Sequence, residues 1–241
     1  MFRSGHSRRS FCKKKSEHKK EKAMKKRVLC YGDSNTWGFI AGSGNRFPDD
    51  VRWTGVCQEK LGEDYKILED GLNGRTTVYD QEWAQGRNGL KGLPYSLQAQ
   101  APLDLCVIML GTNDLSMMSL PLVRLGIEEV VRQVKESNHL YRTFQPIFPE
   151  GPKILLIGPP TYNPAFEEDR NSTIYHKYED SVRLSEVCRE VAEQYDTYYL
   201  DARPFCEVSE IDGCHLTEES HHRLGEAVAA KIREIFEVKE D

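Results

Sequence analysis

From residue 27 onward, short apolar runs alternate with longer stretches in which apolar residues recur every three or four positions. The short runs are typical of buried strands, and the longer period is typical of helices that pack one face against a sheet. Parallel strands need long crossover connections, which are usually helical. The alternation therefore predicts an α/β fold in which helices cover both faces of a parallel sheet, a three-layer αβα sandwich.

Five apolar runs are candidate strands, at residues 28–31, 65–68, 105–110, 154–157 and 198–200. The helical period occupies residues 49–61, 122–136, 173–194 and 217–236. Long insertions rich in Gly, Pro and aromatic residues lie at 42–49, 79–95 and 138–152, and we expect them to shape the acyl and alcohol sites. Five strands joined by right-handed crossovers predict a flavodoxin-like sheet of order 2-1-3-4-5. Ligands of such sheets bind beyond the carboxyl ends of the strands, so we expect the site in the loops that follow them.

The 241 residues suit one domain of this kind, and their net charge of -5 at pH 7 is unevenly spread. Residues 1–27 carry twelve Lys or Arg against two Glu, which leaves the rest of the chain strongly acidic. We interpret residues 1–23 as a solvated, disordered extension that precedes a single domain at 24–241, with Met24 as an alternative translation start. Because the acidic body has no basic run, we expect no nucleic-acid partner.

No stretch approaches the roughly 18 apolar residues of a membrane span, and the basic N-terminus lacks the apolar segment of a secretory signal. The seven cysteines form no CxxC pair, and Cys30, Cys106 and Cys188 lie inside apolar runs. A buried thiol behaves as a small hydrophobic side chain, and reduced thiols are typical of the cytoplasm. We therefore predict a cytoplasmic protein without a membrane partner.

The first candidate strand ends in the sequence GDSNTWG at residues 32–38, which places Ser34 at a strand-to-helix junction. A hydroxyl at such a junction is exposed, which suits a nucleophile. Serine is also a preferred helix N-cap, so a structural interpretation of the triplet stays open. The spacing differs from the G-x-S-x-G turn of α/β-hydrolases, and the loop lacks the glycine patterns of nucleotide-binding folds.

Three further polar segments follow, DGLNGRTT at residues 70–77, GTND at 111–114 and DGCHLT at 212–217. Each of the first two, taken alone, is typical of turns. In the third, Asp212 precedes His215 by three residues, close enough for the carboxylate to hold one ring nitrogen while the other faces a nucleophile. An Asp-x-x-His pair by itself is more often structural.

Taken together and in this order, GDS, the glycine-rich loop, G-x-N-D and D-x-x-H resemble the block pattern of the SGNH (GDSL-type) serine hydrolases. The resemblance runs from about residue 24 to the end of the chain. The segments DVRWTG at 50–55 and GLNGRTT at 71–77 are most similar to the bacterial arylesterase and acyltransferase branch of that family.

The resemblance implies a role for each matching residue. Ser34 is the expected nucleophile, His215 the general base and then acid, and Asp212 the group that orients His215. The expected oxyanion hole consists of the backbone N–H groups of Ser34 and Gly74 and the side-chain amide of Asn113. Neither a metal nor an organic cofactor is implied.

Other polar and aromatic residues lie beside these candidates. Trp37 and Phe39 follow the nucleophile and could line an apolar substrate pocket, with ordinary core packing as the alternative. We interpret Asp33 and Asp114 as hydrogen-bond acceptors that hold their loops in shape.

Two histidines and one cysteine near the C-terminal motif invite other interpretations. His221 and His222 match no common zinc spacing, so we assign no metal and expect a solvent-facing turn of helix. Cys214, between Asp212 and His215, is expected to be an inert small side chain, with sensitivity to oxidation or alkylation as the alternative if it is exposed.

We predict a serine esterase that hydrolyses short-chain acyl or aryl esters through an acyl-enzyme, with acyl transfer to alcohols where the pocket excludes water. The same residues could serve a carbohydrate O-deacetylase or a lysophospholipase, because specificity lies in the loops. A non-catalytic ligand-binding module on the same fold is an alternative from another class. The expected partner is a small ester, although the aromatics of the insertions could also meet a second copy, so a homo-oligomer is an alternative.

Overall fold

The computed structural model describes residues 24–237. Its centre is a five-stranded sheet in the order β2-β1-β3-β4-β5, in which all neighbouring strands are parallel. The strands are β1 (Lys26–Gly32), β2 (Tyr65–Gly71), β3 (Leu105–Met109), β4 (Ile154–Gly158) and β5 (Tyr198–Asp201). The predicted flavodoxin-like αβα fold is confirmed. Residues 1–23, for which we predicted a disordered extension, lie outside the described residues.

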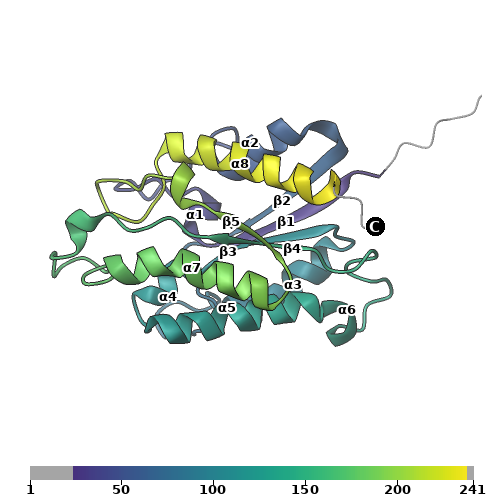
Figure 1. Cartoon of the computed structure of the whole chain (residues 1–241), viewed down its shortest axis with the longest axis horizontal. Helices are drawn as coiled ribbons and strands as arrows, with labels where there is room; N and C mark the ends of the chain where they lie inside the picture. The colour runs from purple at the N-terminus through teal and green to yellow at the C-terminus, as the bar shows by residue number, and fades with distance from the viewer. Residues whose placement is uncertain (1–23, 238–241) are drawn as a thin grey trace, which may run out of the picture.

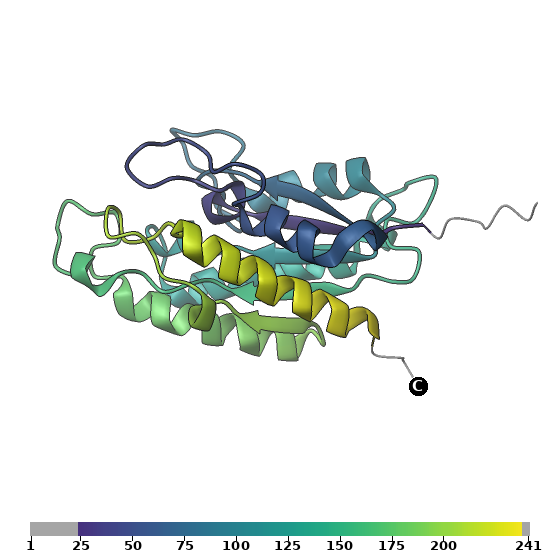
Figure 2. The ribbon, with the colours of Figure 1, turned by 90° about the horizontal axis from the view of Figure 1, so that it is seen from above.

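Helices cover both faces of the sheet (Figure 1). One face carries α2 (Trp53–Leu61) and α8 (Glu218–Glu237), which run side by side in Figure 2. The other face carries α3 (Gly89–Gln100), α5 (Leu120–Lys135) and α7 (Tyr178–Gln194). The short helices are α1 (Ser34–Trp37), α4 (Thr112–Leu115) and α6 (Ser137–Leu140), with 3₁₀ turns at Gly62–Asp64, Pro164–Phe166 and Arg203–Phe205.

The alternation of side chains along β1 divides the core into two apolar layers. Val28 and Cys30 belong to the layer beneath α2 and α8. Leu29 and Tyr31 belong to the layer beneath α3, α5 and α7. None of the four is more than 1% exposed. Burial stabilises a fold by about 25 cal/mol per Å² of apolar surface. Because the two layers supply this stabilisation, the loops can carry polar residues.

Helix α3 is absent from the predicted helices, because residues 79–95 were interpreted as a long insertion. Leu93 and Leu97 lie one helical turn apart and are fully buried. The side chain of Asn88 caps the helix by accepting a hydrogen bond from the backbone N–H three residues later, at 3.0 Å. Pro94 and two glycines hid this helix from a periodicity argument.

The loops that follow the strands gather at the end of the sheet away from the start of β1 and the end of α8, as Figure 2 shows. This is the end at which parallel sheets of this topology bind ligands. Among the helices of residues 24–237, none combines the length and the apolar character that a membrane span requires.

Candidate active site

Ser34 is the first residue of α1, two positions after β1 ends. Asp33 caps this short helix, since its carboxylate accepts the backbone N–H of Asn35 at 2.9 Å. Gly32 allows the tight entry, because a Cβ there would lie 2.0 Å from Oγ1 of Thr36. Ser34 therefore stands where the loops converge, with 6% of its surface exposed.

The structure brings Ser34, His215 and Asp212 together as a hydrogen-bonded series. Nε2 of His215 lies 2.9 Å from Oγ of Ser34, although the two residues are 181 positions apart in the chain. Nδ1 of the same ring lies 2.7 Å from Oδ2 of Asp212. Both distances are those of good hydrogen bonds. The imidazole therefore joins a hydroxyl on one side to a carboxylate on the other.

Asp212 is held as a carboxylate by its surroundings. Burial by itself would raise its pKa, but the hydrogen bond and the charge of His215 outweigh this effect, and the pKa is lowered. The backbone N–H groups of Cys214 and His215 also donate to Oδ1, each at 3.2 Å. An ionised carboxylate can only accept, so Nδ1 of His215 carries the ring proton. Nε2 is then the acceptor that faces the hydroxyl of Ser34.

Asn35 ties α1 to the loop that holds His215, a role that we did not predict. Its side-chain amide donates to the carbonyl of Cys214 at 3.2 Å, and its side-chain oxygen accepts the N–H of Leu216 at 3.0 Å. The two bonds bracket His215, and Asn35 is 2% exposed. A buried amide must find partners, but its burial is a property of the fold, so the sequence carried no signal for this role.

Asn113, one of the three predicted oxyanion donors, contacts the residues next to the other two. Asn113, in α4 after β3, donates through its side-chain amide to the carbonyl of Arg75 at 3.0 Å and reaches the carboxylate of Asp33 at 3.5 Å. Arg75 follows Gly74, and Asp33 precedes Ser34, so these contacts bring the three segments together. Gly74 has a φ of +75°, a left-handed conformation that favours glycine.

Asp33 and Asp114 accept hydrogen bonds from the surrounding loops, as we predicted. Asp114 accepts both the backbone N–H of Thr77, at 2.9 Å, and its hydroxyl, at 2.6 Å, which fixes the loop after Gly74 to α4. Burial raises the pKa of each carboxyl to about 6, although the hydrogen bonds that each accepts oppose the shift. Both carboxyl groups therefore hold the loops of the site in shape.

Of the two aromatic candidates, the structure brings Phe39 to the site. Its ring stacks on His215, with 4.3 Å between the centroids and 32° between the planes. Trp37 lies one ring further out, 6.4 Å from Phe39, and the guanidinium of Arg46 covers it at 5.0 Å. Phe39 is thus positioned to shape the reacting centre, and Trp37 supports it.

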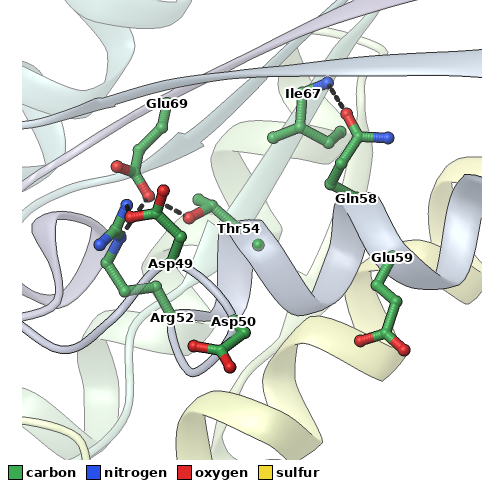
Figure 3. Close-up of a pocket in the computed structure, with 9 residues that line it drawn as sticks. Asp49, Asp50, Arg52, Thr54, Gln58, Glu59, Ile67 and Glu69 are labelled. Carbon is green, nitrogen blue, oxygen red and sulfur yellow. Dashed lines mark hydrogen bonds and ion pairs between the residues drawn. The ribbon is translucent and has the colours of Figure 1, made fainter.

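A cluster of charged side chains anchors the loop between Phe39 and α2 (Figure 3). Nε of Arg52 donates to Glu69 on β2 at 2.8 Å, and its terminal nitrogens donate to Asp49 at 2.6 Å and to the carbonyl of Phe47 at 2.7 Å. The cluster borders a cavity of about 570 Å³ lined by residues of this loop, α2 and β2. We interpret it as structural, because it holds the loop that brings Phe39 to His215.

The prediction of a solvent-facing turn of helix is wrong for His221, because this residue is fully buried. It lies on the face of α8 that also carries Leu224 and Val228, three and seven residues later, and this face packs on the core. The backbone N–H of Trp53 donates to its Nδ1 at 3.3 Å. Burial lowers the pKa of His221 to about 3, so the ring is neutral. His222, on the opposite face, is exposed.

A parallel sheet in this order, with a serine after its first strand and an Asp-x-x-His pair before its last helix, defines the class of SGNH hydrolases. The family model of the GDSL-like lipases and acylhydrolases matches residues 30–223. The chain therefore belongs to the GDSL-like lipase/acylhydrolase family, as the sequence motifs predicted.

Solved structures of ester hydrolases resemble the chain over most of its length. An aryl esterase from M. smegmatis is 35% identical with a TM-score of 0.76, and the match covers 87% of this chain and 99% of that one. A carbohydrate acetylesterase from Sinorhizobium meliloti is also 35% identical, with a TM-score of 0.78 and coverage of 88% and 100%. A putative arylesterase from Agrobacterium tumefaciens is 32% identical, with a TM-score of 0.75 and coverage of 87% and 99%. A comparison with curated proteins gave no significant match.

Proposed function

We propose that this chain is a serine esterase that cleaves short-chain acyl or aryl esters through an acyl-enzyme, with Ser34 as the nucleophile. The observation that carries the proposal is the order of the hydrogen bonds. A serine hydroxyl, an imidazole and an ionised carboxylate follow one another at 2.9 and 2.7 Å. A free serine is a weak nucleophile at neutral pH, and a base within hydrogen-bond reach is what activates it.

The proton movements follow from this order. When Oγ of Ser34 attacks the ester carbonyl, its proton passes to Nε2 of His215, and Asp212 stabilises the imidazolium. As the tetrahedral intermediate collapses, the imidazolium gives that proton to the leaving alcohol. A water molecule then attacks the acyl group, again losing a proton to Nε2, which returns it to Ser34. Where an alcohol replaces this water, the product is a new ester.

The tetrahedral intermediate places a full negative charge on the former carbonyl oxygen, which needs donors fixed in advance. The backbone N–H of Ser34, that of Gly74 and the amide of Asn113 fulfil this role in the proposal. Its support is the convergence of the three segments through the contacts of Asn113 with Asp33 and Arg75. The carboxylate of Asp33 keeps the amide oriented while substrate is absent.

Phe39 supports the preference for small esters. Its ring covers one face of His215, so the acyl or alcohol group must fit beside an apolar wall close to the reacting atoms. The likeness to an aryl esterase agrees with the cleavage of aryl esters. An apolar wall also lowers the local concentration of water, which favours transfer of the acyl group to alcohols.

A second candidate is a carbohydrate acetylesterase, because one such enzyme is as similar to the chain as the aryl esterase is. It would use the same three residues on an acetylated sugar. The two functions differ in the alcohol part of the ester and share the acyl part.

The proposal is tested with p-nitrophenyl esters from acetate to octanoate and with a per-acetylated sugar, each assayed beside Ser34→Ala. We expect the highest kcat/KM on the shortest acyl chains and no activity above background in the variant. Activity on the acetylated sugar alone would favour the second candidate. No activity of the folded protein on any ester would refute both and leave a ligand-binding module.

A further inference from the structure

Cys214 lies between the two residues of the Asp212–His215 pair and points its thiol at both. Its Sγ is 3.5 Å from Nδ1 of His215 and 3.8 Å from Oδ1 of Asp212. The three ligand atoms, a thiol sulfur, a ring nitrogen and a carboxylate oxygen, all lie within 4.8 Å of one another. The side chains of Asp212 and His215 are 27% and 17% exposed, so solvent and small ions reach the cluster.

We propose that Asp212, Cys214 and His215 form an inhibitory site for a thiophilic divalent cation such as Zn²⁺ or Cd²⁺. Zinc binds sulfur at about 2.3 Å and nitrogen at about 2.0 Å, so a tetrahedral ion holds those two atoms about 3.5 Å apart. The separation of Sγ and Nδ1 already has this value. The carboxylate must withdraw from Nδ1 by about half an ångström to admit the ion.

The choice of ion follows from the ligand types. A thiolate and an imidazole select zinc-like ions over Mg²⁺ and Ca²⁺, which prefer oxygen ligands in larger number. Three protein ligands leave the fourth tetrahedral position for water. Burial raises the pKa of the Cys214 thiol, so it is protonated before the ion arrives. The bound cation displaces that proton into solvent, because a coordinated thiol is deprotonated.

Inhibition follows from the proton on His215, and this step rests on the proposed esterase function. In the resting site Nδ1 carries the ring proton and Nε2 accepts from Ser34. An ion bound at Nδ1 takes that position, so the ring proton moves to Nε2. Nε2 then becomes a donor and can no longer accept the proton of Ser34. The ion also removes Asp212 from its role of orienting the ring.

Two measurements test the site, one of which does not need activity. In reduced Ser34→Ala protein, we expect Cd²⁺ to produce an ultraviolet thiolate-to-metal absorbance band that saturates at one equivalent and is missing when Cys214→Ala is added. In the wild type, we expect Zn²⁺ to inhibit ester hydrolysis and EDTA to restore it. Cys214→Ala should raise the half-inhibiting concentration by at least about tenfold, relative to its own metal-free rate.

Cys206→Ala is the matched control, because Cys206 is another partly buried free thiol, and it should leave both responses unchanged. Equal inhibition of the wild type and Cys214→Ala would overturn the proposal, as would an absorbance band that survives the loss of Cys214. If the protein proved not to be an esterase, the cadmium titration would still decide whether the site exists.

Discussion

Two serine-containing polar clusters lie at the same end of the sheet, and they differ in what surrounds the hydroxyl. Ser34, after β1, contacts Nε2 of His215 at 2.9 Å. Ser185, on α7, contacts Asp201 at the end of β5 at 2.9 Å and the hydroxyl of Tyr199 at 2.7 Å. Both hydroxyls are therefore well bonded, but Ser185 has no exposed surface.

The carboxylates of the two clusters differ in the same way. Asp201 is neutralised by Arg203, whose guanidinium donates to both of its oxygens at 2.7 to 3.0 Å. Asp212 is matched with an imidazole, whose charge changes when it takes up a proton. Under the proposed function, a dense polar cluster at the ligand-binding end of a sheet is insufficient for ester hydrolysis. A titratable base and access for substrate distinguish the first cluster from the second.

The largest effect is expected from His215→Ala, which removes the base from the first cluster. We expect turnover on a p-nitrophenyl ester to fall by about 10⁶-fold, as removal of a triad base does in serine hydrolases. Because the ring is partly exposed, the melting temperature should change little. Ser185→Ala is the matched control and should keep full activity. Comparable losses in the two variants would remove the distinction between the clusters.

Asn113→Ala is expected to reduce kcat by about 10²- to 10³-fold with a small change in KM, because an oxyanion donor acts mainly in the transition state. Steady-state kinetics on the shortest active ester measure this. The side chain also contacts Asp33 and Arg75, so the unfolding free energy must be measured in parallel. A rise in KM with an unchanged kcat would show that Asn113 binds the ground state instead.

Asn35→Leu is expected to lower kcat by about 10- to 100-fold, since the loop that holds His215 would lose both bonds to the nucleophile's helix. Asn35→Asp keeps the acceptor for Leu216 and loses the donor to Cys214, so it should fall between the wild type and the leucine variant. The dependence of kcat on pH is compared between the variants and the wild type. A changed pH dependence indicates a misplaced base, whereas a lower kcat with the same pH dependence indicates a general loss of folded protein. Identical kcat values for all three proteins would contradict the positioning role.

A smaller effect, on the free energy of unfolding, is expected from His221, whose imidazole is fully buried. Its pKa is about 3 in the folded protein and about 6.5 when unfolded, so between these values the unfolded state binds more protons. The stability that neutral His221 allows is present above pH 6.5 and is lost as the pH falls. Urea unfolding at pH 7 and pH 5 should show the wild type losing about 2 kcal/mol more than His221→Gln. Equal losses of unfolding free energy in the two proteins would contradict the lowered pKa of His221.

Much of the fold could be predicted from the sequence, because β3 and β4 are continuous apolar runs that are buried along their whole length. Helix α3 was not predicted because Gly92 and Pro94 interrupt the helical pattern of its leucines. The burial of His221 could have been predicted from Leu224 and Val228, which mark its face of α8 as the core face.

The candidate site, too, could be predicted only in part from the sequence. The motifs indicated which segments meet, since each follows a strand or precedes the last helix. Asn35 was missed because its partners lie in a loop about 180 residues away, and local sequence holds no record of such a contact. The approach of Cys214 to both Asp212 and His215 likewise depends on the turn that the loop adopts, which Gly213 allows with a φ of +73°.

The most direct test of the central claim is labelling with a fluorophosphonate probe, followed by mapping of the modified residue by mass spectrometry. Such a probe reacts with a serine whose hydroxyl is activated by a base. We predict a single label on Ser34 in the wild type and in Ser185→Ala, and none in Ser34→Ala or His215→Ala. A folded wild type that fails to react, or a label on a serine other than Ser34, would contradict the account.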